Sequence, residues 1–442
     1  MSRSRATAAL VIGGLLVVLY VVTRLDLSRD TTSSVLVQSE PPAFSAYRHR
    51  VVYTFPGLEL YLYRAYIDDR FNKNLIRIFG IEKKNNVSGN FRCSWSALRD
   101  GITVQAHAPA HKYMVDTSWP NWSPHFANNF DCPIPADDSP SHVLLSRVED
   151  GASVTVPIEL TPVRTPRRRL AVCVKPVTGG HFRVDRLVEW LEMQRQAGVE
   201  RVIIYNTDLA GAARFVLGYY ERNGLVQVVD YPYLTAILQK VNAPKYTPEK
   251  FYAIYQQVYL VAMHDCLYRF RKTYEHMSFI DVDEVILPTR NESLVTAIDR
   301  ARTLYPHAAG LLFLTAWHFE DYYRAHDSST GDKTASYLYM QKYKKATNPI
   351  DNQPKCVVVT DYVITINFHS VLDVFSKMYG NQRVSPVDIG YLHHFRGLCD
   401  AKFEKKTCME LNSTVRIDPV IPRYEAALRT SVGKVLEQLQ VS

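Results

Sequence analysis

Two aspartates at the end of an apolar run are the residues best suited to bind a charged ligand. The segment Met277–Ile280 leads into Asp281 and Asp283, and the apolar segment Val285–Pro288 follows. On an extended backbone, residues i and i+2 point the same way, so both carboxylates can reach one divalent cation. Hard oxygen ligands favour Mg²⁺ or Mn²⁺, and such a cation neutralises a diphosphate leaving group. Asp-x-Asp alone is a common sequence, and the apolar strand around it is what favours a metal site here.

The chain around these aspartates alternates strands with helices. Helices are expected from residues 184, 212 and 248, and strands at 170–177, 200–206, 225–231, 277–288 and 310–317. Strand–helix–strand alternation with right-handed crossovers predicts an α/β fold with a Rossmann-like, mainly parallel sheet flanked by helices. Ligands bind at the carboxyl ends of such strands, which is where the Asp-x-Asp lies. The dinucleotide fingerprint G-x-G-x-x-G is absent from the sequence, so a dehydrogenase is disfavoured.

The hydrophobic pattern of this region differs from that of the region before it. Short alternating runs with turn formers between them occupy residues 46–165 and predict a small antiparallel β domain in an accessory role. Two prolines and three consecutive arginines in Thr161–Arg169 mark the boundary. The α/β domain is therefore expected over 166–415, and a helical segment over 416–442.

The N-terminus reads as a membrane anchor. Residues 6–23 are uncharged, and these 18 residues span about 27 Å as a helix, nearly the thickness of a bilayer core. The arginines in the tail 1–5 place that end in the cytosol, which predicts a type II protein with a stem at 24–45 and a lumenal chain. The alternative is a cleaved signal peptide, although the run is longer than a usual h-region of about 7–15 residues.

Seven cysteines lie beyond the predicted anchor, where oxidation is permitted. We expect a disulfide between Cys399 and Cys408, and a second between Cys93 and Cys132. In contrast, Cys173 and Cys266 lie in apolar periodic stretches and are interpreted as small core residues. An odd count leaves at least one thiol unpaired within the chain. Four N-x-S/T sequons predict a glycoprotein, at Asn86, Asn121, Asn291 and Asn412.

Composition excludes several classes of protein. Of 442 residues, 47% are hydrophobic and 22% charged, which rules out a disordered, collagen-like or multi-span membrane chain. The net charge of +8 is a small, dispersed excess, so no nucleic acid partner is expected. The aromatic content of 12% suits a surface that stacks on sugars or bases.

The order of several motifs resembles glycosyltransferase family 92. The matching pieces are RLVEWLEMQRQAGVERVIIYNTD, AMHDCLYRFR, FIDVDEVILP, AWHFED, KCVVV and LHHFR, which together span roughly residues 168–400. The resemblance implies a GT-A fold and an inverting galactosyltransferase that uses UDP-galactose and Mn²⁺ (or Mg²⁺). It further implies a glycan acceptor on a glycoprotein or glycolipid, and a Golgi membrane location with a lumenal catalytic domain.

The resemblance also assigns roles to individual residues. It makes Asp281 and Asp283 ligands of the metal and the UDP-sugar, and His394 a further metal ligand. Arg396 would lie near the diphosphate, where a guanidinium fork suits phosphate oxygens. The alternative for His394 and its neighbour His393 is a surface pair.

On the nucleoside side, Tyr205 and Asn206 resemble contacts to uridine, and a buried tyrosine with a structural hydrogen bond is the alternative. Trp317 or Tyr322 could form a stacking platform for the acceptor sugar. Glu189, beside Trp190, is interpreted as a core hydrogen-bonding residue rather than a catalytic one.

An inverting transfer needs a general base that deprotonates the acceptor hydroxyl. Glu320 and Asp321 follow the strand 310–317 and are the candidates, with exposed loop acids as the alternative and Glu284 as a further option. Two other functions stay open at this point. One is a lumenal metal-dependent phosphotransferase or nucleotidyltransferase, and the other is a membrane-anchored carbohydrate-binding protein without activity.

Overall fold

A computed structural model describes residues 51–70, 74–85, 87–99, 101–116, 120–177, 183–324, 337–401 and 403–440. The predicted tail, anchor and stem, which end at residue 45, lie outside these ranges. Within the described ranges, no helix is both long and apolar enough to cross a membrane.

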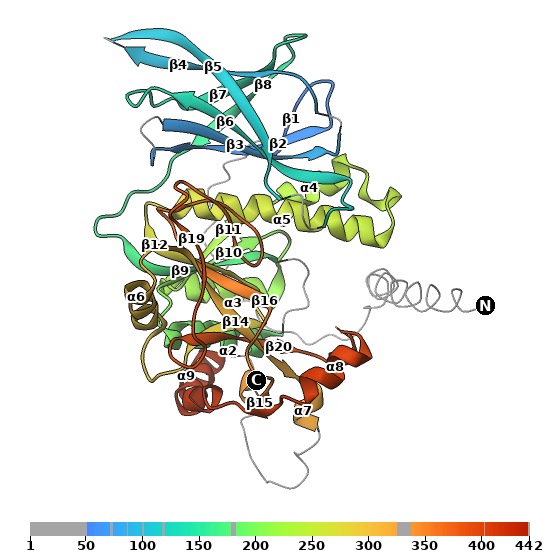
Figure 1. Cartoon of the computed structure of the whole chain (residues 1–442), viewed down its shortest axis with the longest axis vertical. Helices are drawn as coiled ribbons and strands as arrows, with labels where there is room; N and C mark the ends of the chain where they lie inside the picture. Colours follow the sequence, from blue (N-terminus) through green and yellow to red (C-terminus); the bar gives the residue numbers. More distant parts are fainter. Residues whose placement is uncertain are drawn as a thin grey trace, which may run out of the picture.

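The N-terminal part is a closed β-barrel (Figure 1). Its strands are β1 (Tyr53–Thr54), β2 (Leu60–Asp68), β3 (Asn74–Lys83), β4 (Phe91–Arg99), β5 (Ile102–Met114), β6 (His125–Ile134), β7 (His142–Arg147) and β8 (Ser153–Glu159). They follow the order β1-β2-β3-β6-β5-β4-β7-β8, and β8 closes the ring by pairing in parallel with β2. Alternating runs predicted the strands here, but closure is a long-range pairing that alternation does not encode.

A mixed sheet forms the second part. Its strands are β9 (Arg168–Val177), β10 (Arg201–Asn206), β11 (Val226–Asp230), β12 (Tyr274–Ile280), β13 (Glu284–Pro288), β14 (Ala308–Phe319), β16 (Ile350–Val359), β19 (Gly380–Arg383) and β20 (Gly390–Arg396). The order is β11-β10-β9-β12-β16-β14-β20-β13, and β19 pairs with the first half of β14.

The predicted Rossmann-like, mainly parallel sheet was wrong. Strands β11, β10, β9 and β12 are parallel, but β16 inserts antiparallel between β12 and β14, and β13 is antiparallel to β20. The run 277–288 is also two strands, because the chain turns at residues 281–283 and β13 pairs at the far edge of the sheet. Strands alternate with helices only in the first half of this part of the chain. Beyond residue 308, most connections between strands contain no crossover helix.

Helices cover both faces of this sheet. They are α2 (Val184–Ala197), α3 (Gly211–Arg222), α4 (Tyr233–Lys240), α5 (Pro248–Phe270), α6 (Leu294–Leu304), α7 (Glu320–Arg324), α8 (Lys405–Asn412) and α9 (Glu425–Gln438). As predicted, α2 ends at Gly198, whose φ of 92° is left-handed and whose N–H bonds to the last turn. α2 packs on α9, α3 and β13.

The long helix α5 lies between the barrel and the sheet (Figure 1). It is apolar on nearly all sides, because it contacts barrel strands β2, β3 and β6 on one side and β9 on the other. One apolar cluster therefore contains barrel residues such as Tyr66 and Phe79 together with Val258 of α5 and Ala171 of β9. The barrel and the mixed-sheet part share a core.

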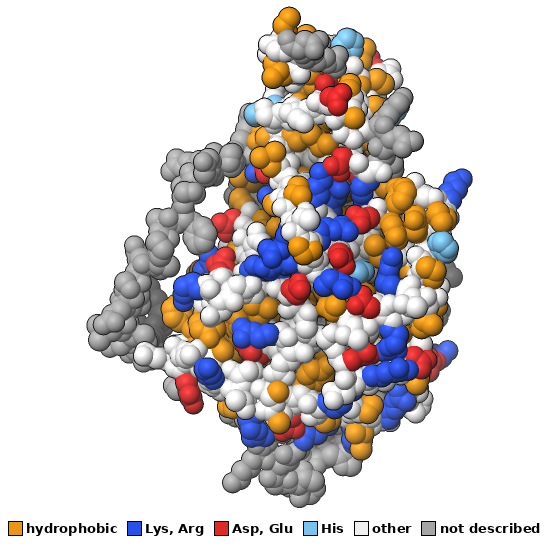
Figure 2. Space-filling model, turned by 90° about the vertical axis from the view of Figure 1, so that its left-hand side faces the viewer, with side chains coloured by type: hydrophobic (Ala, Val, Ile, Leu, Met, Phe, Trp, Pro, Cys, Tyr) orange, Lys and Arg blue, Asp and Glu red, His pale blue; other side chains and the backbone are white. Residues whose placement is uncertain are grey.

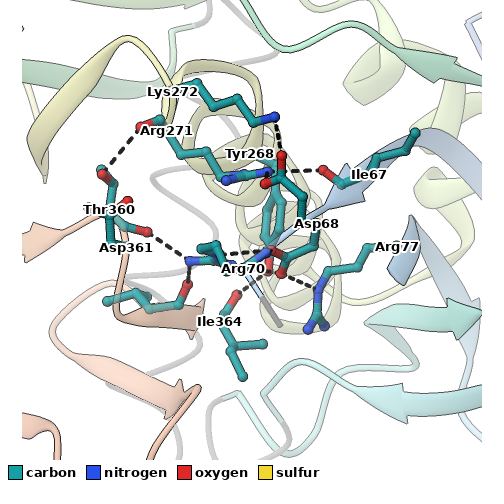
Figure 3. Close-up of polar contacts among 12 residues, drawn as sticks. Ile67, Asp68, Arg70, Arg77, Tyr268, Arg271, Lys272, Thr360, Asp361 and Ile364 are labelled. Atoms are coloured by element: carbon teal, nitrogen blue, oxygen red, sulfur yellow. Dashed lines mark hydrogen bonds and ion pairs between the residues drawn. The ribbon is translucent and has the colours of Figure 1, made fainter. Parts of the chain in front are cut away.

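A polar network reinforces this junction (Figure 3). The carboxylate of Asp68, fully buried at the end of β2, accepts hydrogen bonds from Arg70 Nε at 2.8 Å and Arg77 Nε at 2.9 Å. Arg70 also donates to the carbonyl of Thr360 at 2.7 Å, on the other side of the junction. Arg271, which follows α5, donates to the carbonyl of Ile67 in β2 at 3.1 Å.

Three disulfides are formed. The expected Cys93–Cys132 and Cys399–Cys408 pairs are present. The interpretation of Cys173 and Cys266 as separate core thiols was wrong, because they form a third disulfide between β9 and α5. Both half-cystines are buried, and periodicity reports burial without reporting a partner. The described thiol left free is Cys356, which is also buried.

Candidate active site

A tight turn presents the two aspartates at the end of β12. The backbone N–H of Glu284 donates to the carbonyl of Asp281 at 3.1 Å, and the Glu284 carboxylate accepts the N–H of Asp281 at 2.9 Å. Trp190 of α2 holds the carbonyl of Glu284 through its indole N–H at 2.7 Å. These contacts fix the turn from both sides, so that Asp281 and Asp283 are placed by buried neighbours rather than by a free loop.

Two lysines that the sequence analysis missed contact Asp281. Lys175 Nζ, near the end of β9, lies 2.8 Å from Asp281 Oδ2, and Lys355 Nζ of β16 lies 3.3 Å from the same atom. Lys355 also pairs with Glu284 at 3.1 Å. Burial opposes the charge of Asp281, but the two lysines outweigh it and hold the pKa of Asp281 well below its usual range. A lysine inside each of the apolar runs LAVCVKPV and KCVVV was the signal available in the sequence.

The other side of the turn gathers a mixed oxygen and nitrogen cluster. Ligand atoms of Asp283, Glu284 and His394 lie within 4.8 Å of one another. His394 Nε2 is 3.7 Å from Asp283 Oδ2, and Arg396 Nη1 is 3.3 Å from the same oxygen. Burial alone would raise the pKa of Asp283. His394 and Arg396 lower it by more than burial raises it, so the pKa lies below its usual value.

Strand pairing explains why these residues meet. β20 is antiparallel to β13 with His394 opposite Glu284, and Arg396 follows two residues later on the same face. Arg396 Nε donates to His394 Nε2 at 2.9 Å, so this nitrogen is unprotonated, and a cation bound there would have to displace Arg396 from its lone pair.

The donor set suits a divalent cation, with one difference from the prediction. Asp283, Glu284 and His394 supply two carboxylates and an imidazole, a combination compatible with Mn²⁺. Asp281 is not a member of this cluster, because its carboxylate faces the two lysines. Glu284, a secondary candidate for the base, is 1% exposed and belongs to the cluster instead.

A cavity of about 310 Å³ opens beside the cluster. It is lined by Asp283 and Arg396 on one side and by Arg183, Arg186 and Tyr339 on the other, with further apolar and backbone contacts. The three arginines make this cavity suited to an anionic ligand such as a diphosphate. Arg183 and Arg186 lie at the start of α2 and were not singled out in the sequence.

Glu189 shapes the cavity wall, as its interpretation as a core residue predicted. Its buried carboxylate accepts backbone N–H groups of Met340 at 2.9 Å and Gln341 at 3.3 Å, as well as that of Tyr339. Tyr339 and Met340 line the cavity. Burial raises the pKa of Glu189 to about 7, although the backbone donors favour its charged form.

Trp317 is not a stacking platform. It is completely buried, and its ring stacks on His394 with centroids 4.4 Å apart. The parallel pairing of β14 with β20 sets the two residues side by side. The residue therefore supports the imidazole and offers no face to a sugar. Tyr322, the alternative platform, is 9% exposed and packs against Phe319.

The predicted uridine contacts are used within the fold. Tyr205 is buried, and its hydroxyl donates to Asp265 of α5, which also receives Tyr66 of the barrel. The amide of Asn206 donates to Asp230 at 3.0 Å and accepts the N–H of Leu209 at 2.7 Å. Both residues sit at the carboxyl end of β10 as expected, but their polar groups hold neighbouring elements.

The two candidates for the general base occupy different positions. Asp321 accepts the backbone N–H of Cys399 at 2.9 Å and so anchors the disulfide segment. Glu320 begins α7, and its backbone N–H donates to the carbonyl of Gly397 at 3.2 Å. Gly397 lines the cavity, whereas Glu320 is not among the residues that line it. Neither acid belongs to the metal-type clusters found among the described residues.

The sequence that forms this site is similar to that of other proteins. Residues 168–430 match the profile of glycosyltransferase family 92, and the chain belongs to that family. It is also similar to a beta-1,4-galactosyltransferase of Caenorhabditis elegans, galt-1, with 23% identity over 224 residues. That match covers 48% of this chain and 44% of the relative, so the chain spans less than half the length of the curated relative it matches.

Proposed function

We propose that this glycosyltransferase transfers a hexose, galactose from UDP-galactose, to a glycan acceptor with inversion at the anomeric carbon. The observation that carries the proposal is the cavity beside the Asp283–Glu284–His394 cluster, which Asp283 lines together with Arg183, Arg186 and Arg396. It offers cation ligands and anion-binding groups side by side, as a sugar linked to a diphosphate requires. The galactosyltransferase name of the nematode relative supports the choice of sugar.

Different residues of the chain would bind the cation and the phosphates. Asp283, Glu284 and His394 would hold Mn²⁺ (or Mg²⁺), which when bound offsets the negative charge of the departing diphosphate. Arg396, Arg183 and Arg186 would orient the phosphates through their guanidinium groups. Asp281 pairs with Lys175 and Lys355, which holds the turn against β9 and β16.

Glu320 is the proposed general base, because the Asp321 carboxylate is already bonded to the backbone of Cys399. In the transfer, the acceptor hydroxyl gives its proton to the Glu320 carboxylate. The acceptor oxygen then forms the new bond to the anomeric carbon, and the bond from that carbon to the diphosphate breaks, releasing UDP.

A panel of UDP-sugars tests this proposal. We expect transfer from UDP-galactose to a glycan acceptor in the presence of Mn²⁺, loss of transfer with chelator, and a product of inverted anomeric configuration by NMR. Transfer of a phosphate or nucleotide in place of the sugar would contradict it, as would a product with retained configuration.

We further propose that the domain works in the lumen of the Golgi. Three disulfides support an oxidising compartment, and three of the predicted sequons are exposed, at Asn121, Asn291 and Asn412. Protein isolated from cells should shift to lower mass when treated with an N-glycosidase. A chain that carries no glycan and free thiols throughout would contradict a lumenal location.

A further inference from the structure

A second cluster of metal-type ligands lies behind the active site. It consists of His318 of β14, His393 of β20 and Asp418, which follows the short strand β21 (Arg416–Ile417). All three side chains are buried, with exposures of 0%, 0% and 2%. Because successive residues of a strand face opposite sides, His393 points away from the side that His394 occupies. The cluster is therefore separate from the one at the turn 281–284.

The three ligand atoms form a triangle of suitable size. His318 Nε2 is 3.1 Å from His393 Nδ1 and 3.7 Å from Asp418 Oδ2, and His393 Nδ1 is 3.4 Å from Asp418 Oδ2. A tetrahedral Zn²⁺ with bonds of about 2.0–2.1 Å separates neighbouring ligand atoms by roughly 3.3–3.4 Å. The observed separations lie around that value.

Hydrogen bonds to neighbouring backbone groups orient two of these ligands. His318 Nδ1 is 3.0 Å from the carbonyl oxygen of Tyr343, which can only accept, so Nδ1 carries the proton and Nε2 the lone pair. Asp418 is held at its other oxygen by the N–H groups of Val420 at 2.7 Å and Ile421 at 3.0 Å. A histidine that donates its remote N–H to a carbonyl, and a carboxylate fixed by hydrogen bonds, are the supporting contacts of metal ligands.

From this geometry we propose that His318, His393 and Asp418 bind a structural Zn²⁺. The hydroxyl of Tyr391 donates to Asp418 Oδ2 at 3.1 Å. The ion ties the segment after β21 to two neighbouring strands of the sheet. Since His393 adjoins His394, it also fixes the strand that presents the active-site imidazole. The assignment does not rest on the transfer reaction.

Zinc content of the purified full-length protein is the first test, measured by elemental analysis after gel filtration in metal-free buffer. We expect about one Zn²⁺ per chain in the wild type and in two controls, Asp283→Asn and Tyr391→Phe. The first control removes a ligand of the other cluster, and the second removes only a hydroxyl beside Asp418. His318→Gln and Asp418→Asn should lose the zinc. Wild-type protein that stays free of zinc after incubation with excess ZnCl₂ overturns the proposal, and so does zinc that is lost from Asp283→Asn.

Cobalt gives a second test that needs no ligand variant to fold. Zinc-free wild type and Asp283→Asn are loaded with Co²⁺, and both should show the intense visible absorption of tetrahedral cobalt. The weak spectrum of octahedral Co²⁺, or no binding, would show a hydrogen-bonded cluster without an ion. Neither measurement uses a UDP-sugar, so failure here and failure of the proposed transfer remain distinguishable.

Discussion

At the residue scale, the two aspartates of the turn have different surroundings, and their loss should differ in kind. Asp283→Asn would remove a proposed cation ligand whose side chain is 31% exposed, so transfer should fall by 10-fold or more, roughly the cost of a lost metal contact, with little change in thermal midpoint. Asp281→Asn removes the carboxylate that pairs with Lys175 and leaves Lys355 paired with Glu284 alone, so it should also lower the free energy of unfolding by about 1–3 kcal/mol.

Enzyme assays and thermal unfolding of both variants check this difference. Asp137→Asn, an exposed barrel carboxylate, serves as the control and should change neither property. Equal stability of the Asp281 and Asp283 variants would show that the lysines do not depend on Asp281.

Glu189 provides a prediction about pH. Its pKa rises from 4.5 to about 7 on folding, so between these values the folded chain binds more protons than the unfolded chain. The stabilisation from this proton is complete below pH 4.5 and is lost as pH rises to about 7. Glu189→Gln has no such proton. The unfolding free energy of the wild type minus that of the variant should therefore decrease by up to about 3 kcal/mol over this range.

Denaturant titrations at several pH values measure that difference. A difference that stays constant with pH would mean that the three backbone donors keep Glu189 ionised throughout.

At the element scale, the pairing of β14 with β20 stacks the Trp317 ring on His394, and we expect Trp317 to position that imidazole. Trp317→Leu should raise the Mn²⁺ concentration needed for half-maximal activity several-fold more than it raises the KM for the acceptor. Trp317→Phe keeps an aromatic ring against the imidazole and should rescue most of the loss. Metal titrations of transfer activity distinguish a positioning role from a direct contact with the acceptor sugar. Loss of a direct contact would raise the acceptor KM instead.

The sequence predicted local features of this site better than its long-range ones. Apolar runs placed Asp283 at the end of a strand, and the motif order placed His394 and Arg396 near it. Periodicity did not reveal that β13 leaves the turn to pair with β20, or that β16 inserts antiparallel, because strand partners are chosen by contacts distant in the chain. For the same reason Lys175 and Lys355 were not connected to Asp281. For Tyr205 the structure shows the alternative left open, a buried tyrosine with a structural hydrogen bond, and the platform predicted for Trp317 failed because a single aromatic letter does not reveal burial.

At the scale of the whole molecule, the barrel and the catalytic part are joined by a shared core and by the buried charges around Asp68 (Figure 3). Over one face, basic and acidic side chains are interspersed rather than separated by sign (Figure 2). The arginines keep the pKa of Asp68 far below its usual value despite burial, so this stabilisation is present above about pH 4 and is lost as pH falls.

Asp68→Asn should therefore lower the unfolding free energy by about 3–5 kcal/mol, because buried Arg70 loses its carboxylate partner and Arg77 is left with Asp131 as its carboxylate partner. The matched control is Asp361→Asn, whose carboxylate is 45% exposed and pairs with Arg167, and which should cost less than about 1 kcal/mol. Denaturant unfolding at pH 7 compares the two. A similar small effect for both would indicate that the junction depends on its apolar core alone.

The most direct test of the whole account is the position of Mn²⁺ and UDP in a crystal grown with both. The anomalous signal of manganese should mark an ion in contact with Asp283 and His394, and the diphosphate should lie in the cavity beside Arg396. An ion away from the turn 281–284, or UDP bound outside this cavity, would contradict the proposed site of transfer.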